Sequence, residues 1–253
     1  MEIKLALSKT VAKNAEQYFQ QAKKARKKAK GAREAVEKFK KKLKKETKKI
    51  RPEKKEVPPA KKEWYDKFRW FESSEGFLVL CGRDATTNDI LIKKHTEKDD
   101  MVFHTIMAGS PFCVIKTEKK KPGEKTVHEA ATFTVTFSKA WKLGLTTTDV
   151  YHVTPEQVSK TAKAGEYLKK GAFMIYGRKT FVAVQVDLAV GNKDSRIMAG
   201  PLSAVKKHCK NYVALAQGRE KTSAIAKKIQ KKIGGNLDDI IRVLPAGGLR
   251  IKQ

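Results

Sequence analysis

The apolar positions of residues 11–43 are spaced four and three residues apart in alternation, without a break. They are Val11, Ala15, Tyr18, Ala22, Ala25, Ala29, Ala32, Val36, Phe39 and Leu43. This is the a/d spacing of a coiled coil, and it predicts one helix on the order of 50 Å long. The middle of the stripe is alanine and the other faces are mostly lysine, so the stripe alone buries too little to hold the helix. We therefore expect residues 1–50 to be a coiled-coil arm with a partner helix, from a second copy, another molecule or a longer protein.

The pattern changes at residues 51–62, where Pro52, Pro58 and Pro59 prevent continued helix in a charged segment. We interpret this segment as a linker. A core domain over residues 63–190 follows, in which short apolar runs predict strands. The predicted strands are 77–81, 90–94, 101–107, 112–117, 149–153, 172–176 and 180–190.

Two pairs of these strands are predicted to be hairpins. The first joins 77–81 to 90–94 through a loop at 82–88, and the second joins 172–176 to 180–190 across Gly177-Arg178-Lys179. Thr126 and Glu129 resemble a capping box that starts a helix, although the β-branched content leaves a strand at 133–137 as the alternative. Residues 155–163 are expected to form a helical turn.

Residues 191–253 are expected to form a small αβ unit. A strand at 212–216, a lysine-rich helix at 222–233 and a helix end or strand at 239–244 are separated by glycine-rich turns. With the preceding elements this predicts an α+β fold with a mixed or antiparallel sheet.

Charge changes the picture of what this fold binds. The chain of 253 residues has 56 lysines and arginines against 27 acidic residues, a net charge of +29. Residues 1–62 hold 23 of the basic and 7 of the acidic residues, so the excess extends through the core domain as well. Charge of this size indicates a polyanionic partner. Nucleic acid, including DNA, an anionic membrane face and an acidic protein are the candidates.

Three widely spaced cysteines, Cys81, Cys113 and Cys209, contain no C-x-x-C pair. We therefore expect neither a disulfide framework nor a thiolate zinc site. No apolar run approaches the roughly 20 residues of a membrane span, and no signal segment is found at the start. These features predict a cytoplasmic protein that does not enter membranes.

Several constellations are candidates for function. The aromatic–basic cluster 64–71 has the residue types that stack bases and neutralise phosphates, although its aromatics are more typical of core anchors. For Lys67 and Arg69 a phosphate contact is favoured. Arg83 could equally contact a phosphate or pair with Asp84, whereas Gly82 is expected to serve backbone geometry.

The remaining candidates do not favour an enzyme. His104, in an apolar strand, is expected to be a satisfied core histidine, since no other histidine has metal-ligand spacing to it. Ser159 and Lys160 are adjacent and therefore point apart on a helix, so Lys160 is better explained as a phosphate contact than as a partner in catalysis. Arg178 and Lys179 at a hairpin tip could hold a phosphate. We expect no catalytic residue, no metal and no cofactor.

An ordered series of segments resembles the NFACT-R domain, the RNA-binding domain of the NFACT family of ribosome-quality-control proteins, also described in bacteria as fibronectin-binding-like. The segments are WYDKFRWFESSEGFLVLCGRDATTNDILIKK (64–94), Phe103-His104, Gly109-Ser110, Glu156–Lys160, Gly165–Leu168, Gly171, Phe173, Met174 and Gly177. The arm resembles the descending half of the family's coiled coil, and the tail resembles an archaeal-type extension.

The resemblance implies an α+β core that contacts tRNA or rRNA on the large ribosomal subunit during rescue of stalled translation. Full-length members of the family recruit tRNA for C-terminal tailing. Ile106 and Ala108 stand where the family often has an Asp and a second His, so chemistry or a hydrogen-bond network built on those two side chains is not expected. The family's N-terminal domain and first coiled-coil helix are not found here, so tailing by this chain alone is not expected. The expected RNA-binding positions are Lys67, Arg69, Arg83, Asp84, Asn88, Lys93, Lys94, His104, Lys116, Gln157, Ser159, Lys160, Tyr167, Arg178 and Lys179.

Two other classes of function stay open. An RNA-modifying or RNA-processing enzyme would use His104, Asp84 and the Ser159–Lys160 pair. A coiled-coil adaptor would bind a partner through the alanine stripe, and its basic charge would then be incidental.

Overall fold

The computed structural model describes residues 5–8, 10–47, 63–161 and 168–252. The chain divides into two units, Met1–Glu56 and Val57–Gln253, which are described separately.

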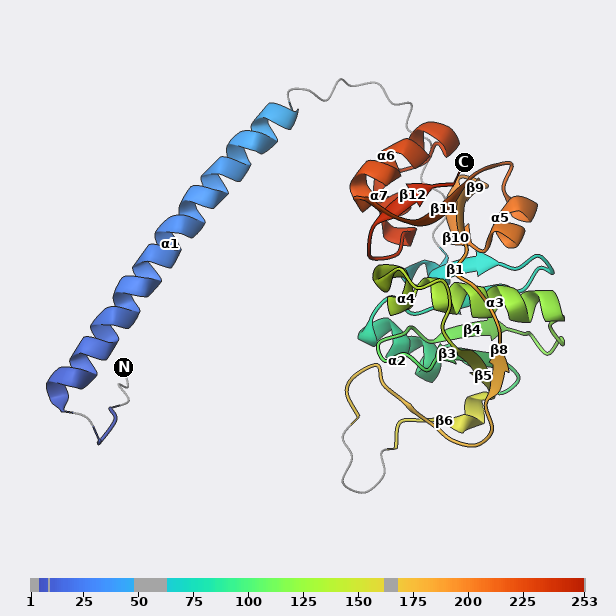
Figure 1. Ribbon diagram of the computed structural model, residues 1–253, viewed down its shortest axis with the longest axis horizontal. Coiled ribbons are helices and arrows are strands. Elements are labelled where there is room, and N and C mark those ends of the chain that lie inside the picture. Colours follow the sequence, from blue (N-terminus) through green and yellow to red (C-terminus); the bar gives the residue numbers. More distant parts are fainter. Residues whose placement is uncertain (1–4, 9, 48–62, 162–167, 253) are drawn as a thin grey trace. The chain divides into compact units, whose positions relative to one another are not determined.

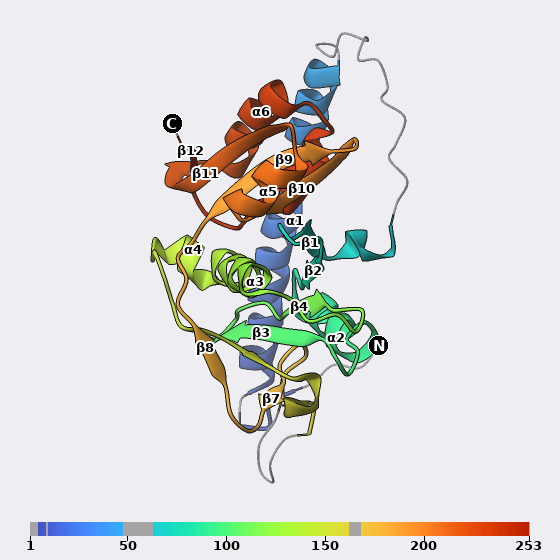
Figure 2. The same cartoon turned by 90° about the vertical axis from the view of Figure 1, so that its right-hand side faces the viewer.

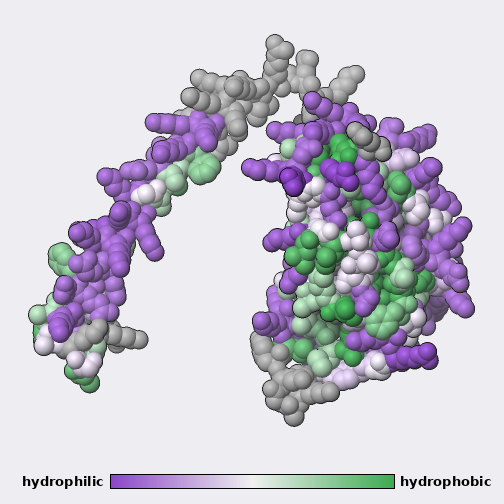
Figure 3. Space-filling view, in the orientation of Figure 1, coloured by the Kyte–Doolittle hydropathy of each residue, from purple (hydrophilic) through white to green (hydrophobic). Residues whose placement is uncertain are grey.

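The described residues of the first unit include one long helix, α1 (Val11–Thr47), as the spacing predicted. Figure 3 shows that its surface is mainly hydrophilic, with isolated apolar patches. The residues of the predicted stripe from Val11 to Phe39 are all exposed, among them Val11 by 81%, Val36 by 51% and Phe39 by 66%. The helix is confirmed, whereas a coiled coil needs a partner helix and stays a prediction.

A six-stranded sheet organises the second unit (Figure 1). Its strand order is β1-β2-β4-β3-β5-β8, and all of its strand pairs are antiparallel. The strands are β1 (Arg69–Glu72), β2 (Leu78–Cys81), β3 (Met101–Thr105), β4 (Cys113–Lys116), β5 (Val150–Val153) and β8 (Thr180–Val182). The prediction of an α+β fold with an antiparallel sheet is therefore confirmed.

Helices and short turns surround this sheet. Helix α3 (Glu124–Thr136) packs across β3, β4 and β5, and its Phe133 ring lies 4.7 Å from that of Phe71 in β1. The other elements here are η1 (Trp64–Lys67), α2 (Ala85–Lys94), α4 (Lys139–Leu143) and η2 (Pro155–Gln157). A two-stranded sheet pairs β6 (Val158–Ser159) with β7 (Met174–Ile175).

A second sheet, in the order β10-β9-β11-β12, forms the rest of the unit (Figure 2). Its elements are β9 (Leu188–Lys193), β10 (Arg196–Gly200), α5 (Leu202–His208), β11 (Asn211–Glu220), α6 (Thr222–Ile233), α7 (Leu237–Val243) and β12 (Leu249–Ile251). Helix α6 has the predicted bounds and buries Ile225, Ala226 and Ile229. An ion pair from Lys193 in β9 to Glu72 in β1 connects the two sheets, and one from Arg196 in β10 to Asp66 connects the second sheet to η1.

Several predictions about elements are wrong. The helical turn expected over 155–163 is limited to η2, because Val158–Ser159 form strand β6. Residues 85–94 form helix α2 rather than a loop and a strand, because the Asp84 side chain accepts a hydrogen bond from the Thr87 N–H and caps the helix. Residues 172–176 and 180–190 do not pair with each other, since β7 pairs with β6 and β8 pairs with β5. Helix α3 follows Gly123, so Thr126 lies inside the helix instead of capping it.

The expectation of no disulfide is also wrong, because Cys81 and Cys113 form one. Strands β2 and β4 are paired in a register that places these two cysteines directly opposite each other. The two cysteines are 32 residues apart in the sequence, so the sequence alone does not show that they are close in space.

Candidate functional site

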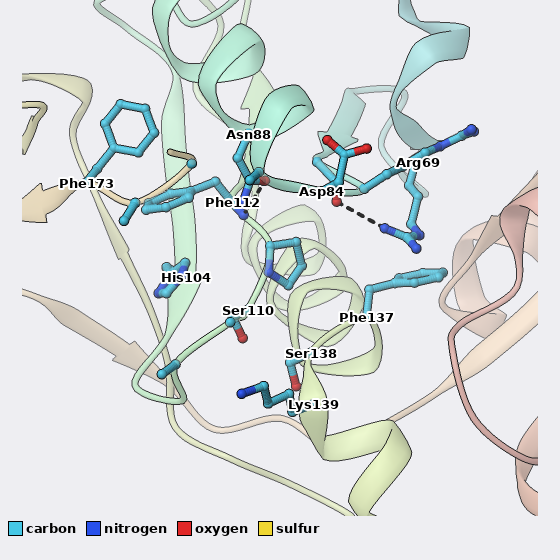
Figure 4. Close-up of a pocket in the computed structure, with 18 of the residues that line it drawn as sticks. Arg69, Asp84, Asn88, His104, Ser110, Phe112, Phe137, Ser138, Lys139 and Phe173 are labelled. Carbon is cyan, nitrogen blue, oxygen red and sulfur yellow. Dashed lines mark hydrogen bonds between the residues drawn. The ribbon is translucent and has the colours of Figure 1, made fainter. Parts of the chain in front are cut away.

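One end of the six-stranded sheet opens into a groove of about 750 Å³. It is formed where β2 and β3 end and where β1, β4 and β5 begin, together with the first turn of α2, the α3–α4 connection and the segment before β7 (Figure 4). The lining includes Arg69, Arg83, Asp84, Asn88, His104, Phe112, Phe137, Lys139, Lys142, Tyr151, Lys170, Phe173 and Lys179. Aromatic and basic side chains from distant parts of the sequence therefore meet in one place.

The start of α2 forms one wall of this groove. Asp84 caps the helix, and the side-chain oxygen of buried Asn88 accepts a hydrogen bond from the Phe112 N–H at 3.3 Å. A Cβ on Gly82 would lie 1.8 Å from that same oxygen, so only glycine leaves room for Asn88. The sequence predicted that Gly82 serves the backbone geometry. The structure shows that glycine is needed here because the Asn88 side chain comes so close to the backbone. Asp84 and Asn88 shape the wall through contacts within the protein.

Two arginines lie beside this wall. The guanidinium carbon of Arg69 lies 4.7 Å from the centre of the Phe137 ring, and its Nη1 donates to the Gly82 carbonyl oxygen at 3.1 Å. Burial, followed by the nearby charge of Arg83, lowers the pKa of Arg69 to about 10. Both arginines are partly buried, and neither forms an ion pair with a carboxylate in the described part of the chain.

The other part of the groove is aromatic. The His104 ring centre lies 4.3 Å from that of Phe112, and Phe112 contacts Phe173 edge-on at 5.3 Å. Burial lowers the pKa of His104, so the neutral ring is favoured. Figure 4 shows His104, Phe112 and Phe173 on the side of the groove away from Arg69. His104 is half-buried and lines the groove, so it is not the core histidine that the sequence predicted.

Exposed lysines supply positive charge around the groove. Lys139, Lys142 and Lys170 are exposed and line it, and the Lys179 ammonium lies 4.6 Å from the centre of the Tyr151 ring. The sequence pattern did not single out the first three. Only the general basic composition indicated that these lysines could bind a polyanion. No local sequence pattern shows that the starts of α4 and β7 lie near α2.

Lys160 connects the segment before β7 to helix α2. Its ammonium donates to Asp89 at 3.2 Å and to the carbonyl oxygen of Ala172 at 2.8 Å, and it lies 4.6 Å from the centre of the Phe173 ring. Gly171, with φ +76°, comes so close that an added Cβ would lie 2.4 Å from the Ala85 Cα. Lys160 thus positions the groove wall, and its predicted contact with RNA stays a prediction.

Two further predicted positions, Gln157 and Ser159, also bind the protein itself. The Gln157 amide donates to the carbonyl oxygens of Tyr176 at 2.8 Å and Arg178 at 2.9 Å, which holds the turn between β7 and β8. The Ser159 hydroxyl accepts a hydrogen bond from the Thr161 N–H at 3.0 Å. The Arg178 side chain, in the same turn, is exposed.

The remaining predicted positions lie outside the groove. Lys67, Lys93 and Lys94 are exposed. Lys116 is 8% exposed and pairs with Asp100 at 2.5 Å, and with a second carboxylate, so its surroundings are those of a structural ion pair. Tyr167 lies outside the described residues.

The aromatic–basic cluster is mainly scaffold, as its residue types favoured. Phe68, Trp70 and Phe71 are buried in the core. Trp64 is 48% exposed, and its ring lies against that of His95 with centres 4.7 Å apart. This outer tryptophan is the ring of the cluster with the most surface that a base could reach.

Residues 67–177 match the family model described as the NFACT protein RNA binding domain. This part of the chain is an NFACT-R domain, as the sequence resemblance indicated. It includes every groove residue named above except Lys179.

Known proteins with similar sequences bear the names of ribosome quality control proteins. The archaeal Rqc2 homolog aRqcH of Methanocaldococcus jannaschii is 44% identical over 197 residues, which cover 75% of this chain and 29% of that protein. The ribosome quality control complex subunit NEMF of Homo sapiens is 42% identical over 122 residues, 47% of this chain and 11% of NEMF. The NEMF homolog of Drosophila melanogaster is 41% identical over 121 residues, 47% of this chain and 12% of that protein. The chain therefore spans less than a third of the length of these curated relatives.

Neither a metal centre nor a membrane span is present in the described residues. They contain no cluster of three or more histidine, cysteine or acidic side chains arranged to hold a metal ion. Among them, no helix has the length and apolar character needed to span a bilayer.

Proposed function

We propose that the groove of the NFACT-R domain binds structured RNA. The observation that carries this proposal is the concentration of exposed, unpaired lysines, Lys139, Lys142, Lys170 and Lys179, around one groove of the described structure. Lysines grouped in this way neutralise phosphates and give affinity that depends on salt. The match to an RNA-binding family supports RNA as the polyanion.

We further propose that the RNA is tRNA or rRNA on the large ribosomal subunit, and that the protein acts in the rescue of stalled translation in the cytoplasm. The support is the set of relatives named as ribosome quality control proteins. The chain matches only a minor part of their length, and we propose that it does not perform tailing by itself.

We propose binding rather than catalysis as the activity. The groups that an RNA-modifying enzyme would need are engaged in the fold: the Asp84 carboxylate caps α2, and the Lys160 ammonium is bonded to Asp89 and to backbone carbonyls. Mass spectrometry of RNA after incubation with the protein tests this point. An altered nucleotide or a new RNA end that depends on His104 would favour an enzyme instead.

Titration of fluorescently labelled tRNA over a series of salt concentrations tests the main proposal. Neutralising Lys139, Lys142, Lys170 and Lys179 one at a time should weaken binding. The logarithm of the binding constant falls linearly with the logarithm of the salt concentration. Each lysine–phosphate contact that is lost should make this slope less steep by about 0.7–0.9. Neutralising Lys206, an exposed lysine of α5 that does not line the groove, is the matched control. Equal losses at Lys206 and at the groove lysines would contradict a role for the groove.

The long helix supports a second interaction. We propose that α1 binds another helix, because Val11, Val36 and Phe39 are exposed along the predicted stripe. Measurement of the mass in solution separates the possible partners. A dimer that is lost on replacing Val36 and Phe39 by serine indicates self-pairing, whereas a monomer at all concentrations indicates an outside partner.

A further inference from the structure

Buried positive charge in this fold is neutralised in all but two places. Among the described residues, the lysines and arginines that are not exposed are Lys116, Lys160, Lys193, Arg196, Arg69 and Arg83. The first four each form an ion pair with an aspartate or glutamate. No such pair is formed by Arg69 or Arg83 within the described part of the chain. Both of these arginines line the groove.

The contacts that Arg69 and Arg83 do make cannot neutralise them. Arg69 donates to one carbonyl oxygen, and the Arg83 Nη2 donates to the carbonyl oxygens of Phe68 at 3.0 Å and Asp66 at 3.4 Å. The Nε atoms of both arginines are buried and have no hydrogen-bond partner. An unpartnered buried donor on a charged group is costly.

Burial and neighbouring positive charges make the charged state of these two arginines less favourable in the free protein. Burial lowers the pKa of each arginine, and the Arg83 charge contributes to the effect on Arg69. Arg242, in helix α7, which packs against the second sheet, adds a further positive charge near Arg83.

The Asp84 carboxylate on this wall raises the pKa of both arginines but is outweighed by burial, and it accepts the capping hydrogen bond from the Thr87 N–H. Asp66 and Asp239 also act on Arg83 and offset part of this effect, but in the described part of the chain their ion pairs are with Arg196 and Arg242. Neither Arg69 nor Arg83 therefore has a carboxylate of its own as a direct partner.

We propose that Arg69 and Arg83 form a phosphate-binding site within the groove. A guanidinium presents a fixed fork of N–H donors that matches the oxygens of a phosphate group. The Phe137 ring lies 4.7 Å from the Arg69 guanidinium carbon, a cation–π contact that helps to position the guanidinium. The inference rests on the proposed RNA binding, which makes a phosphodiester of the RNA chain the expected ligand. Inorganic phosphate shares this chemistry and serves as a separate probe.

The first test measures thermal unfolding in phosphate-free buffer. Arg69→Met keeps an unbranched chain against Phe137 and removes a charge that has no partner, so its melting temperature should equal or exceed that of the wild type. Lys116→Met removes a cation that does have a partner and should lower the melting temperature markedly. If Arg69→Met is destabilised as much as Lys116→Met, Arg69 is a structural cation and the proposal is overturned.

The second test adds the ligand. Inorganic phosphate, compared with chloride at equal ionic strength, should raise the melting temperature of the wild type and of Lys206→Met more than that of Arg69→Met. An oligoribonucleotide with a 5′-hydroxyl, which carries only internal phosphodiesters, should bind Arg69→Met about tenfold more weakly. Arg69→Lys, which keeps a point charge, should recover part of this loss.

The outcomes separate this site from the proposed function. If the wild type binds no RNA but phosphate still stabilises it through Arg69, the proposed RNA binding fails and the anion site stands. If the wild type binds RNA and Arg69→Met binds it with the same affinity and salt slope, RNA binding stands and the phosphate site is overturned. Equal stabilisation of wild type and Arg69→Met by phosphate also overturns it.

Discussion

The Asn88 side chain occupies the space that a side chain at Gly82 would need. Its oxygen accepts the Phe112 N–H at 3.3 Å, and it would lie 1.8 Å from a Cβ at position 82. This contact connects helix α2 to the chain entering β4 and fixes one wall of the groove.

Gly82→Ala should therefore destabilise the protein by about 1–3 kcal/mol, because the new methyl group must displace Asn88 from its hydrogen bond. Chemical denaturation measures the loss. Asn88→Ala should also destabilise, whereas the double variant should lose less than the sum of the two single variants, since alanine at 88 makes room for alanine at 82. Strictly additive losses would show that the two residues do not compete for this space.

Lys116 is expected to act on stability rather than on RNA affinity. Its ammonium is buried between Asp100 and Glu97, so Lys116→Met leaves the Asp100 carboxylate buried without its partner. The expected cost is about 3–5 kcal/mol. The folded fraction of the variant should bind RNA with the affinity of the wild type, because Lys116 does not line the groove. A variant of normal stability that has lost RNA affinity would contradict this prediction.

Stability should fall as the pH drops below the ordinary histidine value. Burial lowers the pKa of His104 below its value of 6.5 in the unfolded chain, so the unfolded state binds the proton more readily. The contribution of His104 is therefore complete above pH 6.5 and is lost as the pH falls through the folded-state pKa. His95 and His152 are shifted in the same direction, also chiefly by burial. Urea denaturation of His104→Phe, which keeps a ring against Phe112, should show a smaller slope of stability against pH in this window. An unchanged slope would show that other histidines, and not His104, cause the loss of stability at low pH.

The sequence pattern was sufficient where one periodicity dominated. Helix α1 was predicted because its unbroken spacing of apolar residues leaves one interpretation. Helix α2 was misread because Thr86, Thr87, Ile90 and Ile92 give it the β-branched content of a strand. The cap formed by Asp84 and Thr87 was the local signal that could have identified it.

The groove could not be derived from the sequence, because its parts are distant in the chain. Arg69, His104, Lys139 and Lys179 meet only through the pairing order of the sheet, and no local pattern encodes that order. The resemblance to a known domain identified several groove residues. It could not distinguish those that line the groove from those that support it, such as Gln157, or that lie elsewhere, such as Lys116.

Lys160 should affect the groove indirectly, by holding the segment before β7 against helix α2. Its ammonium binds Asp89 and the carbonyl oxygens of Lys169 and Ala172, so Lys160→Met removes the connection between α2 and the segment before β7. We expect a loss of about 1–3 kcal/mol and faster hydrogen exchange at the Gly171 amide, which donates to the same Asp89. Lys179→Met is the matched comparison: it should weaken RNA binding while hydrogen exchange at Gly171 stays unchanged. If Lys160→Met weakens RNA binding with unaltered exchange at Gly171, Lys160 contacts the RNA directly, as the sequence predicted.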